Sequence, residues 1–212
     1  RAAKCNRLVS RLAMVGAVLL VILMVKGSAE FIRNSTAGNA GGAERVAGEI
    51  NTSGSTAMAR TVNLAEEASI AALVKAVLAR FGRIDILHNN AANTGAAQMT
   101  RDASLAEMDA EVWDAAFDIN TRGTMLMTKH VAPHMAAGGG GSIINTSSGV
   151  SLLGDILNPA YSSSKAAVNA LTRNTAGVQL PQQPLPHTTA STRYVASTWG
   201  SCCTRLASSP PW

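Results

Sequence analysis

Large apolar residues recur every three or four positions between residues 66 and 81. They are Ile70, Leu73, Val74, Val77, Leu78 and Phe81. This spacing places them on one face and predicts an amphipathic helix packed against a sheet, with Gly82 ending it. Residues 84–90 come next and are nearly all apolar up to His88, which predicts a parallel strand buried on both faces.

The rest of the central region shows the same alternation of patterns. Residues 142–146 are rich in β-branched residues and follow a run of glycines, which predicts a buried strand. The other predicted elements are helices at 41–54, 109–132 and from Ala160 onward, and a strand at 56–64. Strands that alternate with helices predict an α/β fold built from β-α-β units.

The two ends of the chain depart from this alternation. Residues 12–25 form an apolar run preceded by Arg and Lys, which fits a signal peptide, a short membrane anchor, a buried strand or a buried helix. The run is shorter than the ~20 residues of a spanning helix, so we expect no membrane association. Residues 177–212 are rich in Pro, Ser and Thr and predict an irregular tail. We therefore expect one domain over residues 1–176, with an atypical segment at 1–39.

Charge is distributed unevenly along the chain. The net charge is +5, but residues 1–33 hold six Lys and Arg against one Glu, and residues 166–212 hold three Arg and no acid. A nucleic-acid site would need basic residues gathered on a folded face, so we expect no nucleic-acid partner. At 47% hydrophobic and 15% charged, the composition excludes a disordered chain.

Cysteine and histidine usage gives no sign of a metal site. Cys5, Cys202 and Cys203 lack metal-ligand spacing, and adjacent cysteines rarely form a structural disulfide. His130 and His134 are four residues apart, but no third ligand is suggested. We expect no metal, and free thiols in a reducing, cytoplasmic compartment.

Candidate chemistry lies between residues 141 and 165. Tyr161 and Lys165 are four residues apart, so on a helix they share one face. A phenol has a pKa of about 10, and a neighbouring ammonium lowers it toward values suited to proton exchange with an alcohol or carbonyl. Ser148, at the end of the preceding strand, can hold the same substrate oxygen. The spacing of Tyr161 and Lys165 taken alone also occurs on solvated helices.

The segment GSIINTSSGVSLLGDILNPAYSSSK resembles the active-site segment of the short-chain dehydrogenase/reductase family. The resemblance extends over residues 40–176. It implies a Rossmann-like, doubly wound parallel sheet with helices on both faces, incomplete at its N- and C-terminal ends. It implies that Tyr161 is the general acid/base, that Lys165 lowers its pKa and binds the nicotinamide ribose, and that Ser148 orients the substrate. Asn120, in the phrase FDINTRG, matches an asparagine that supports a proton relay.

The resemblance also implies a cofactor, NAD or NADP. Asn90 and Ala91 stand in NNAA, which is similar to the family's NNAG motif and implies that both lie beside the cofactor. Asn63 falls where the family has an aspartate that contacts the adenine; it is also suited to cap the helix that follows. No TGxxxGxG turn for the pyrophosphate can be written anywhere in the first 40 residues, so we expect weakened cofactor binding.

The expected function is therefore an NAD(P)-dependent oxidoreductase that interconverts a small-molecule alcohol and a carbonyl, acting as a homo-oligomer. Three alternatives remain open. The chain is an inactive remnant or non-catalytic binding module of this family, a reductase anchored through residues 12–25, or a lyase or isomerase on the same scaffold.

Overall fold

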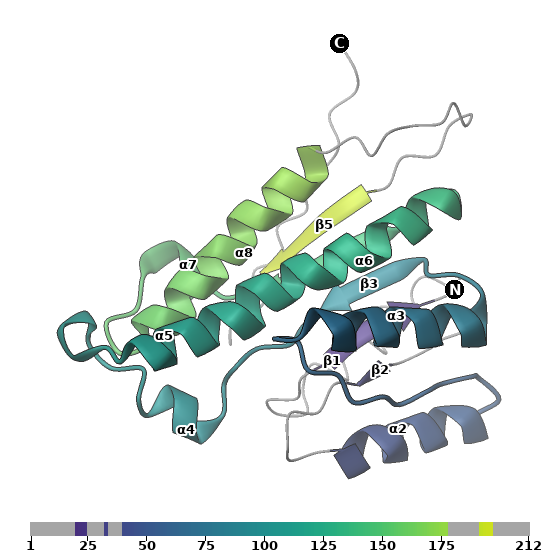
Figure 1. The fold of residues 1–212 in the computed structure, drawn as a ribbon, viewed down its shortest axis with the longest axis horizontal. Coiled ribbons are helices and arrows are strands. Elements are labelled where there is room, and N and C mark those ends of the chain that lie inside the picture. The colour runs from purple at the N-terminus through teal and green to yellow at the C-terminus, as the bar shows by residue number, and fades with distance from the viewer. Residues whose placement is uncertain (1–19, 25–31, 34–39, 178–190, 197–212) are drawn as a thin grey trace.

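The structure is a computed structural model that describes residues 20–24, 32–33, 40–177 and 191–196. Its strands form one sheet in the order β2-β1-β3-β4-β5 (Figure 1). The strands are β1 (Leu20–Met24), β2 (Ile32–Arg33), β3 (Ile86–Asn89), β4 (Ser142–Ser147) and β5 (Ser191–Ala196). The helical elements are α2 (Ala40–Thr52), α3 (Glu67–Phe81), α4 (Ala96–Met99), η1 (Leu105–Glu107), α5 (Ala110–Phe117), η2 (Asp118–Arg122), α6 (Gly123–Ala137), α7 (Val150–Leu153) and α8 (Pro159–Gly177).

Three strands form the parallel part of the sheet. β3 pairs with β4 through Asn89 opposite Asn145, and β4 pairs with β5 in the same direction. The chain passes from β3 to β4 through α4, α5 and α6, and from β4 toward β5 through α7 and α8. Figure 1 shows α3, α6 and α8 side by side in front of the strands. The predicted Rossmann-like α/β fold is confirmed.

The first two strands run in the opposite sense. β1 pairs antiparallel with β3, with Ile22 opposite His88, and β2 pairs antiparallel with β1. Part of the apolar run at 12–25 is thus a strand of the sheet, while residues 12–19 and Val25 lie outside the described residues. Within the described part of the chain, no helix has the length and hydropathy needed to span a membrane.

Two sequence predictions about strands are wrong. Residues 56–64 form no strand; the position beside β3 is occupied by β1, and the segment instead turns Val62 and Leu64 into the hydrophobic core. Residues 191–196, predicted to belong to an irregular tail, form β5 at the edge of the sheet. Both errors have the same cause. A strand forms only where another segment, often distant in the sequence, lies beside it and pairs with it, and the local sequence pattern does not show which segment that is.

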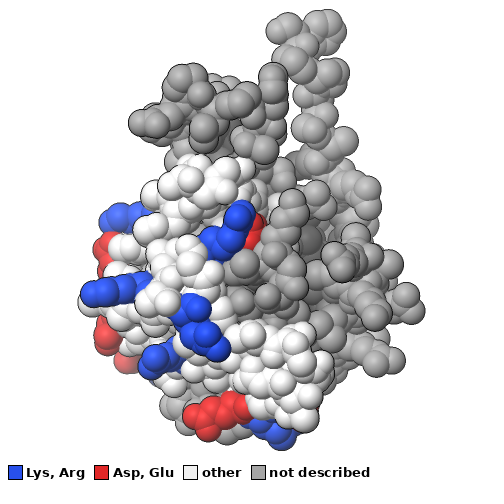
Figure 2. Space-filling model, turned by 90° about the vertical axis from the view of Figure 1, so that its right-hand side faces the viewer, with Lys and Arg blue, Asp and Glu red and all other residues white. Residues whose placement is uncertain are grey.

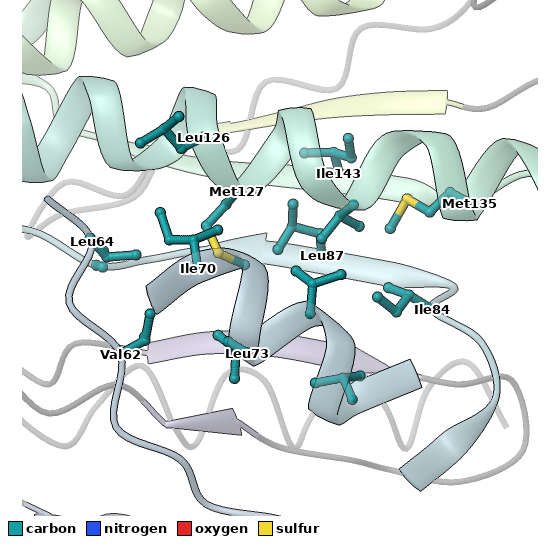
Figure 3. Packing of buried hydrophobic residues seen from close by; sticks show 14 residues of the cluster. Val62, Leu64, Ile70, Leu73, Ile84, Leu87, Leu126, Met127, Met135 and Ile143 are labelled. Atoms are coloured by element: carbon teal, nitrogen blue, oxygen red, sulfur yellow. The ribbon is translucent and has the colours of Figure 1, made fainter. Parts of the chain in front are cut away.

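The core lies between α3, α6 and β3. Figure 3 shows Ile70 of α3 next to Met127 of α6, and Leu73 and Leu87 belong to the same cluster. Ile70, Leu87 and Val131 are fully buried. The helix predicted at 66–81 is confirmed: it runs from Glu67 to Phe81, and Gly82 ends it with φ at 78° and its N–H donating to the Leu78 carbonyl.

Charged side chains of both signs occupy the described surface. Figure 2 shows Lys and Arg beside Asp and Glu on one face of the molecule. Glu67 of α3 accepts a hydrogen bond from Lys129 of α6 at 2.7 Å and contacts His130 at 2.9 Å. These pairs link neighbouring helices, but exposed ion pairs of this kind contribute little to stability.

Candidate active site

Two serines end β4 and place hydroxyl groups at the carboxyl edge of the sheet. The Ser147 side chain is buried; its hydroxyl donates to the Lys165 carbonyl at 3.2 Å and lies 3.1 Å from the Ser151 hydroxyl. Ser148 follows and is half-buried. Its hydroxyl is hydrogen-bonded to the Tyr161 side chain, and its carbonyl accepts the Ser151 hydroxyl. Ser148, which the sequence predicts to orient the substrate oxygen, therefore lies beside Tyr161.

Tyr161 and Lys165 lie in the first two turns of α8. The Lys165 Nζ sits 5.9 Å from the centre of the Tyr161 ring. Pro159 begins the helix, where its missing N–H costs nothing because the first helical donors have no partner within the helix. Helical spacing therefore brings the phenol and the amine to one face, as the sequence predicts.

The expected direction of the Tyr161 pKa is wrong. Burial of the ring raises the pKa of Tyr161, and the hydrogen bond from Ser148 lowers it only in part. The reason is geometric, because the Lys165 ammonium lies toward the ring and donates to a backbone carbonyl. In this arrangement the phenol is a proton donor that stays protonated at neutral pH.

Lys165 is one of the most buried charged groups in the described chain, with 2% of its surface exposed. Its Nζ donates to the Thr146 carbonyl at 2.9 Å. Desolvation lowers the pKa of Lys165 to about 8. The Thr146 hydroxyl lies 2.9 Å from Nε2 of His88, and burial with the nearby Lys165 charge lowers the pKa of His88 to about 4. The imidazole is therefore neutral at pH 7.

Asn120 lies in a π-helical turn, η2, between α5 and α6. The sequence predicts one continuous helix here, and the structure adds a widened turn at the site, a feature often found at functional positions. Asn120 is fully buried. Its Oδ1 accepts the Asn93 N–H at 2.7 Å and its Nδ2 donates to the Ser164 hydroxyl at 2.9 Å. The side chain thus joins the loop after β3 to α8.

The predicted cofactor residues occupy different places. Asn90 and Ala91 follow β3 directly at the carboxyl edge of the sheet, and Ala91 is buried. Asn63 lies on the surface before α3; its Oδ1 accepts the Ala65 N–H at 3.1 Å and its Nδ2 donates to Glu66 at 2.8 Å. Asn63 therefore organises the turn before α3, while Glu66 occupies the cap position itself.

Sequence analysis missed three residues that support the site. Thr146 supplies the carbonyl that binds Lys165, Ser164 binds the Asn120 amide, and the Asp102 carboxylate accepts the backbone N–H groups of Ala160 and Tyr161. Thr146 and Ser164 lie within the segment that the sequence analysis identified as the candidate site, so a role at the site could have been predicted from their positions. Asp102 has no such signal, because it lies 58 residues from its partner.

Four apolar side chains are exposed in the segment of the chain that joins Ser148 to Tyr161. Leu152 and Leu153 end α7, and Ile156 and Leu157 follow before α8 begins. Each of the four has between 70 and 91% of its surface exposed. Apolar side chains exposed together in this way are typical of a surface that binds a ligand or another protein.

The chain is similar to known proteins over most of its described length. The family model described as short chain dehydrogenase matches residues 21–183. A cis-4-hydroxycyclohexanecarboxylate dehydrogenase of Sinomonas cyclohexanicum is 35% identical over 162 residues, which cover 76% of this chain and 61% of that protein. The chain spans between 40 and 61% of the length of the first four curated relatives that it matches.

Two solved structures resemble the fold described above. A metagenomic short-chain oxidoreductase in complex with NADP superposes with a TM-score of 0.66 at 28% identity, covering 82% of this chain and 72% of that one. An NAD⁺-bound xylitol dehydrogenase superposes with a TM-score of 0.62 at 26% identity, covering 69% of this chain and 54% of that one.

Proposed function

This chain belongs to the short-chain dehydrogenase family, and we propose that it interconverts an alcohol and a carbonyl compound by hydride transfer with NAD or NADP. One observation carries the proposal: the Ser148 hydroxyl is hydrogen-bonded to the Tyr161 phenol, and the Lys165 ammonium lies 5.9 Å from the same ring. Three groups from two elements thus meet at the carboxyl edge of the parallel strands. Ligands bind at this edge in open α/β sheets.

The residues at this edge fit the nicotinamide half of a dinucleotide. Among the described residues, Lys165 Nζ has one acceptor, the Thr146 carbonyl, whereas an ammonium carries three donors. The two remaining N–H groups suit the hydroxyls of a ribose. Ala91, at the end of β3, has no side chain beyond Cβ to obstruct a flat ring. When bound, the nicotinamide would supply or accept the hydride.

The protein residues would handle the proton. The Tyr161 hydroxyl, protonated at neutral pH, donates to the oxygen of a carbonyl substrate as that oxygen gains charge. Ser148 donates to the same oxygen and orients it. Lys165 adds positive charge beside the phenol and would return a proton to it. Asn120 binds both the loop after β3 and α8, and so would hold the groups that transfer the proton in place.

Binding of the pyrophosphate half is expected to be weak. The sequence contains no TGxxxGxG turn, which would offer backbone N–H groups to the phosphates at a helix N-terminus. We therefore propose a dinucleotide affinity well below that of a chain with the complete turn. The alternative is an inactive relative or a non-catalytic binding module, which would show no turnover whether or not it binds a dinucleotide.

The test has two steps. Binding of NADH and NADPH is measured by fluorescence, and oxidation of the bound nucleotide is then followed by absorbance with a panel of aliphatic and cyclic ketones. We choose apolar ketones because the segment that joins Ser148 to Tyr161 exposes the apolar side chains of Leu152, Leu153, Ile156 and Leu157. We expect slow turnover that Tyr161→Phe abolishes and that Ser148→Ala reduces by about 100-fold or more.

The controls separate the possible outcomes. Ser53→Ala removes an exposed hydroxyl at the end of α2 and should leave turnover unchanged. Turnover that survives Tyr161→Phe would overturn the proposed mechanism. Binding with no turnover on any ketone would support the binding module, and product formation with no change in nicotinamide absorbance would indicate a lyase or isomerase.

We further propose that the protein acts on small molecules in the cytoplasm and forms a homo-oligomer. The small-molecule substrate and the oligomer follow from its family membership, and the cytoplasmic location follows from cysteines whose positions suit free thiols in a reducing compartment. Size-exclusion chromatography with light scattering tests the oligomer, and a monomer at micromolar concentration would contradict it.

A further inference from the structure

The first turn of α8 has its backbone donors satisfied by a distant part of the chain. The N–H groups of Ala160 and Tyr161 donate to the two carboxylate oxygens of Asp102, each at 2.9 Å. In most helices these donors are met by the side chain of the residue just before the helix. Here that residue, Asn158, contributes its carbonyl, which accepts the Ser162 N–H at 3.0 Å. The capping side chain is that of Asp102, which lies 58 residues before Ala160 in the sequence.

The position of Asp102 is fixed by its own segment. Its N–H donates to the Gln98 carbonyl at 2.9 Å, and the Gln98 amide donates to the Val112 carbonyl of α5 at 2.8 Å. The Gln98 Oε1 accepts from the Asn93 side chain at 3.1 Å, and the Asn93 N–H donates to Asn120. The segment from Asn93 to Asp102 is therefore attached at one end to the π turn and at the other to α8.

The contact between Asp102 and α8 is buried, so the carboxylate needs hydrogen-bond partners. Asp102 has 1% of its surface exposed and Ala160 has none. A carboxylate buried without partners is unstable, whereas one that accepts two N–H groups at the positive end of a helix is favoured by charge-assisted hydrogen bonds and by the helix dipole. Because both oxygens are used, rotation of the first turn of α8 breaks at least one of the two bonds. Tyr161 is the residue whose N–H forms the second bond.

We propose that Asp102 is a positioning residue for the reaction: by holding the backbone of Ala160 and Tyr161, it fixes the phenol beside Ser148. Asp102 touches none of the reacting groups and acts through Tyr161. The inference rests on the function proposed above, but its central test does not require turnover.

The test measures whether Ser148 still affects Tyr161 after Asp102 is changed. The sequence contains only two tyrosines, so tyrosinate absorbance during an alkaline titration, compared with Tyr161→Phe, isolates the Tyr161 phenol. In the native chain Ser148→Ala removes the hydrogen bond that lowers the pKa of Tyr161, so the titration of this phenol moves to higher pH. We expect this movement to be lost when Asp102→Ala is already present.

Each outcome decides the proposal. An equal effect of Ser148→Ala in both backgrounds would mean that Asp102 does not place the phenol, and would overturn it. No effect of Ser148→Ala in the native chain would also overturn it, because the pairing that Asp102 is said to hold would not exist. If Asp102→Ala does not fold, Asp102→Asn is used, which keeps one acceptor and should weaken the effect of Ser148→Ala.

A second variant separates positioning from helix capping. Asn158→Asp in the Asp102→Ala background converts the amide just before α8 into a carboxylate, which adds negative charge at the positive end of the helix. We expect it to restore thermal stability while the effect of Ser148→Ala stays lost, since α8 is no longer tied to the segment ending at Asp102. Restoration of that effect would show that Asp102 is only a cap.

Turnover gives an independent readout where the proposed function holds. Misplacement of a reacting group by about 1 Å costs on the order of 100-fold, so we expect Asp102→Ala to lower kcat by about 10- to 100-fold with the Kd for NADPH unchanged. A chain with no turnover would defeat the proposed function, and the tyrosine titration would still decide the role of Asp102.

Discussion

Lys165 Nζ lies 5.9 Å from the centre of the Tyr161 ring, and it donates its hydrogen bond to the Thr146 carbonyl at 2.9 Å. The amine therefore lies over the tyrosine ring, within the protein interior. Burial opposes the charged form of both groups, raising the pKa of Tyr161 and lowering that of Lys165. The pH behaviour of the site follows from this relationship.

Lys165→Met is expected to stabilise the folded chain at pH 7. The pKa of Lys165 falls from 10.5 to about 8 on folding, so between these values the unfolded chain binds more protons and stability rises with pH. The burial cost is complete below pH 8 and declines above it. Urea unfolding from pH 7 to 10 should show the advantage of Lys165→Met shrinking as the pH rises. A constant difference between variant and native chain would contradict this.

Carbonyl reduction is expected to slow as the pH rises through about 8. Tyr161 keeps its proton in this range because its pKa is raised, whereas Lys165 loses the positive charge that supports the phenol and the ribose. The measurement is kcat/KM for a ketone against pH, which reports groups of the free enzyme. Lys165→Arg, which stays charged, should lower the rate but remove the fall near pH 8.

His88 is expected to make the fold sensitive to acid. Its pKa falls from 6.5 to about 4 because burial and the Lys165 charge oppose protonation. The folded chain binds fewer protons in this window, so stability is complete above pH 6.5 and is lost as the pH falls toward 4. The loss is on the order of 3 kcal/mol, at about 1.4 kcal/mol per pKa unit.

Unfolding of His88→Leu between pH 7 and 4 measures this effect, and the variant should lose most of the pH dependence. Thr146→Val is the matched control, since it removes the hydroxyl 2.9 Å from Nε2 and leaves the imidazole in place. Its pH dependence should remain close to that of the native chain. The prediction fails if His88→Leu loses stability as steeply as the native chain.

Gly123 and Gly48 are expected to respond to alanine in opposite directions. A Cβ on Gly123, the first residue of α6, would lie 2.9 Å from the Leu64 Cβ and 3.3 Å from its carbonyl oxygen. Gly123→Ala should therefore destabilise the chain by about 1–3 kcal/mol. Gly48 lies within α2 with nothing within 4 Å of a Cβ, so Gly48→Ala should stabilise by about 0.5–1 kcal/mol. Thermal unfolding compares the two variants directly.

Asn120→Ala is expected to destabilise the chain and to weaken nucleotide turnover together. The change leaves the Asn93 N–H without its acceptor and removes one hydrogen bond from the Ser164 hydroxyl, which still donates to the Tyr161 carbonyl. A buried N–H left unpaired costs roughly 1–3 kcal/mol. Thr121→Val is the control, because it removes a single hydrogen bond to the Ser164 carbonyl in the same π turn. A loss for Asn120→Ala no larger than that of Thr121→Val would contradict the bridging role.

Much of the parallel part of the fold could be predicted from local pattern. The spacing of Ile70, Leu73 and Val77 is enough to define α3, because one helical face repeats every three to four residues whatever lies opposite. The same reasoning places Tyr161 and Lys165 on one face of α8. The prediction of a strand at 56–64 was wrong because a strand needs a neighbouring strand to pair with, and β1 already occupies the place beside β3.

The amino-acid sequence by itself determined the long helices α2, α3 and α8, the buried strands β3 and β4, and the order Ser148, Tyr161, Lys165 that indicates the chemistry. These features depend on periods of two to four residues and are therefore encoded locally. Only the tertiary structure decided the direction of the Tyr161 pKa, the bridge made by Asn120, and the cap that Asp102 provides to α8. These features depend on burial and on contacts between residues tens of positions apart, which exist only once the helices and the sheet have packed.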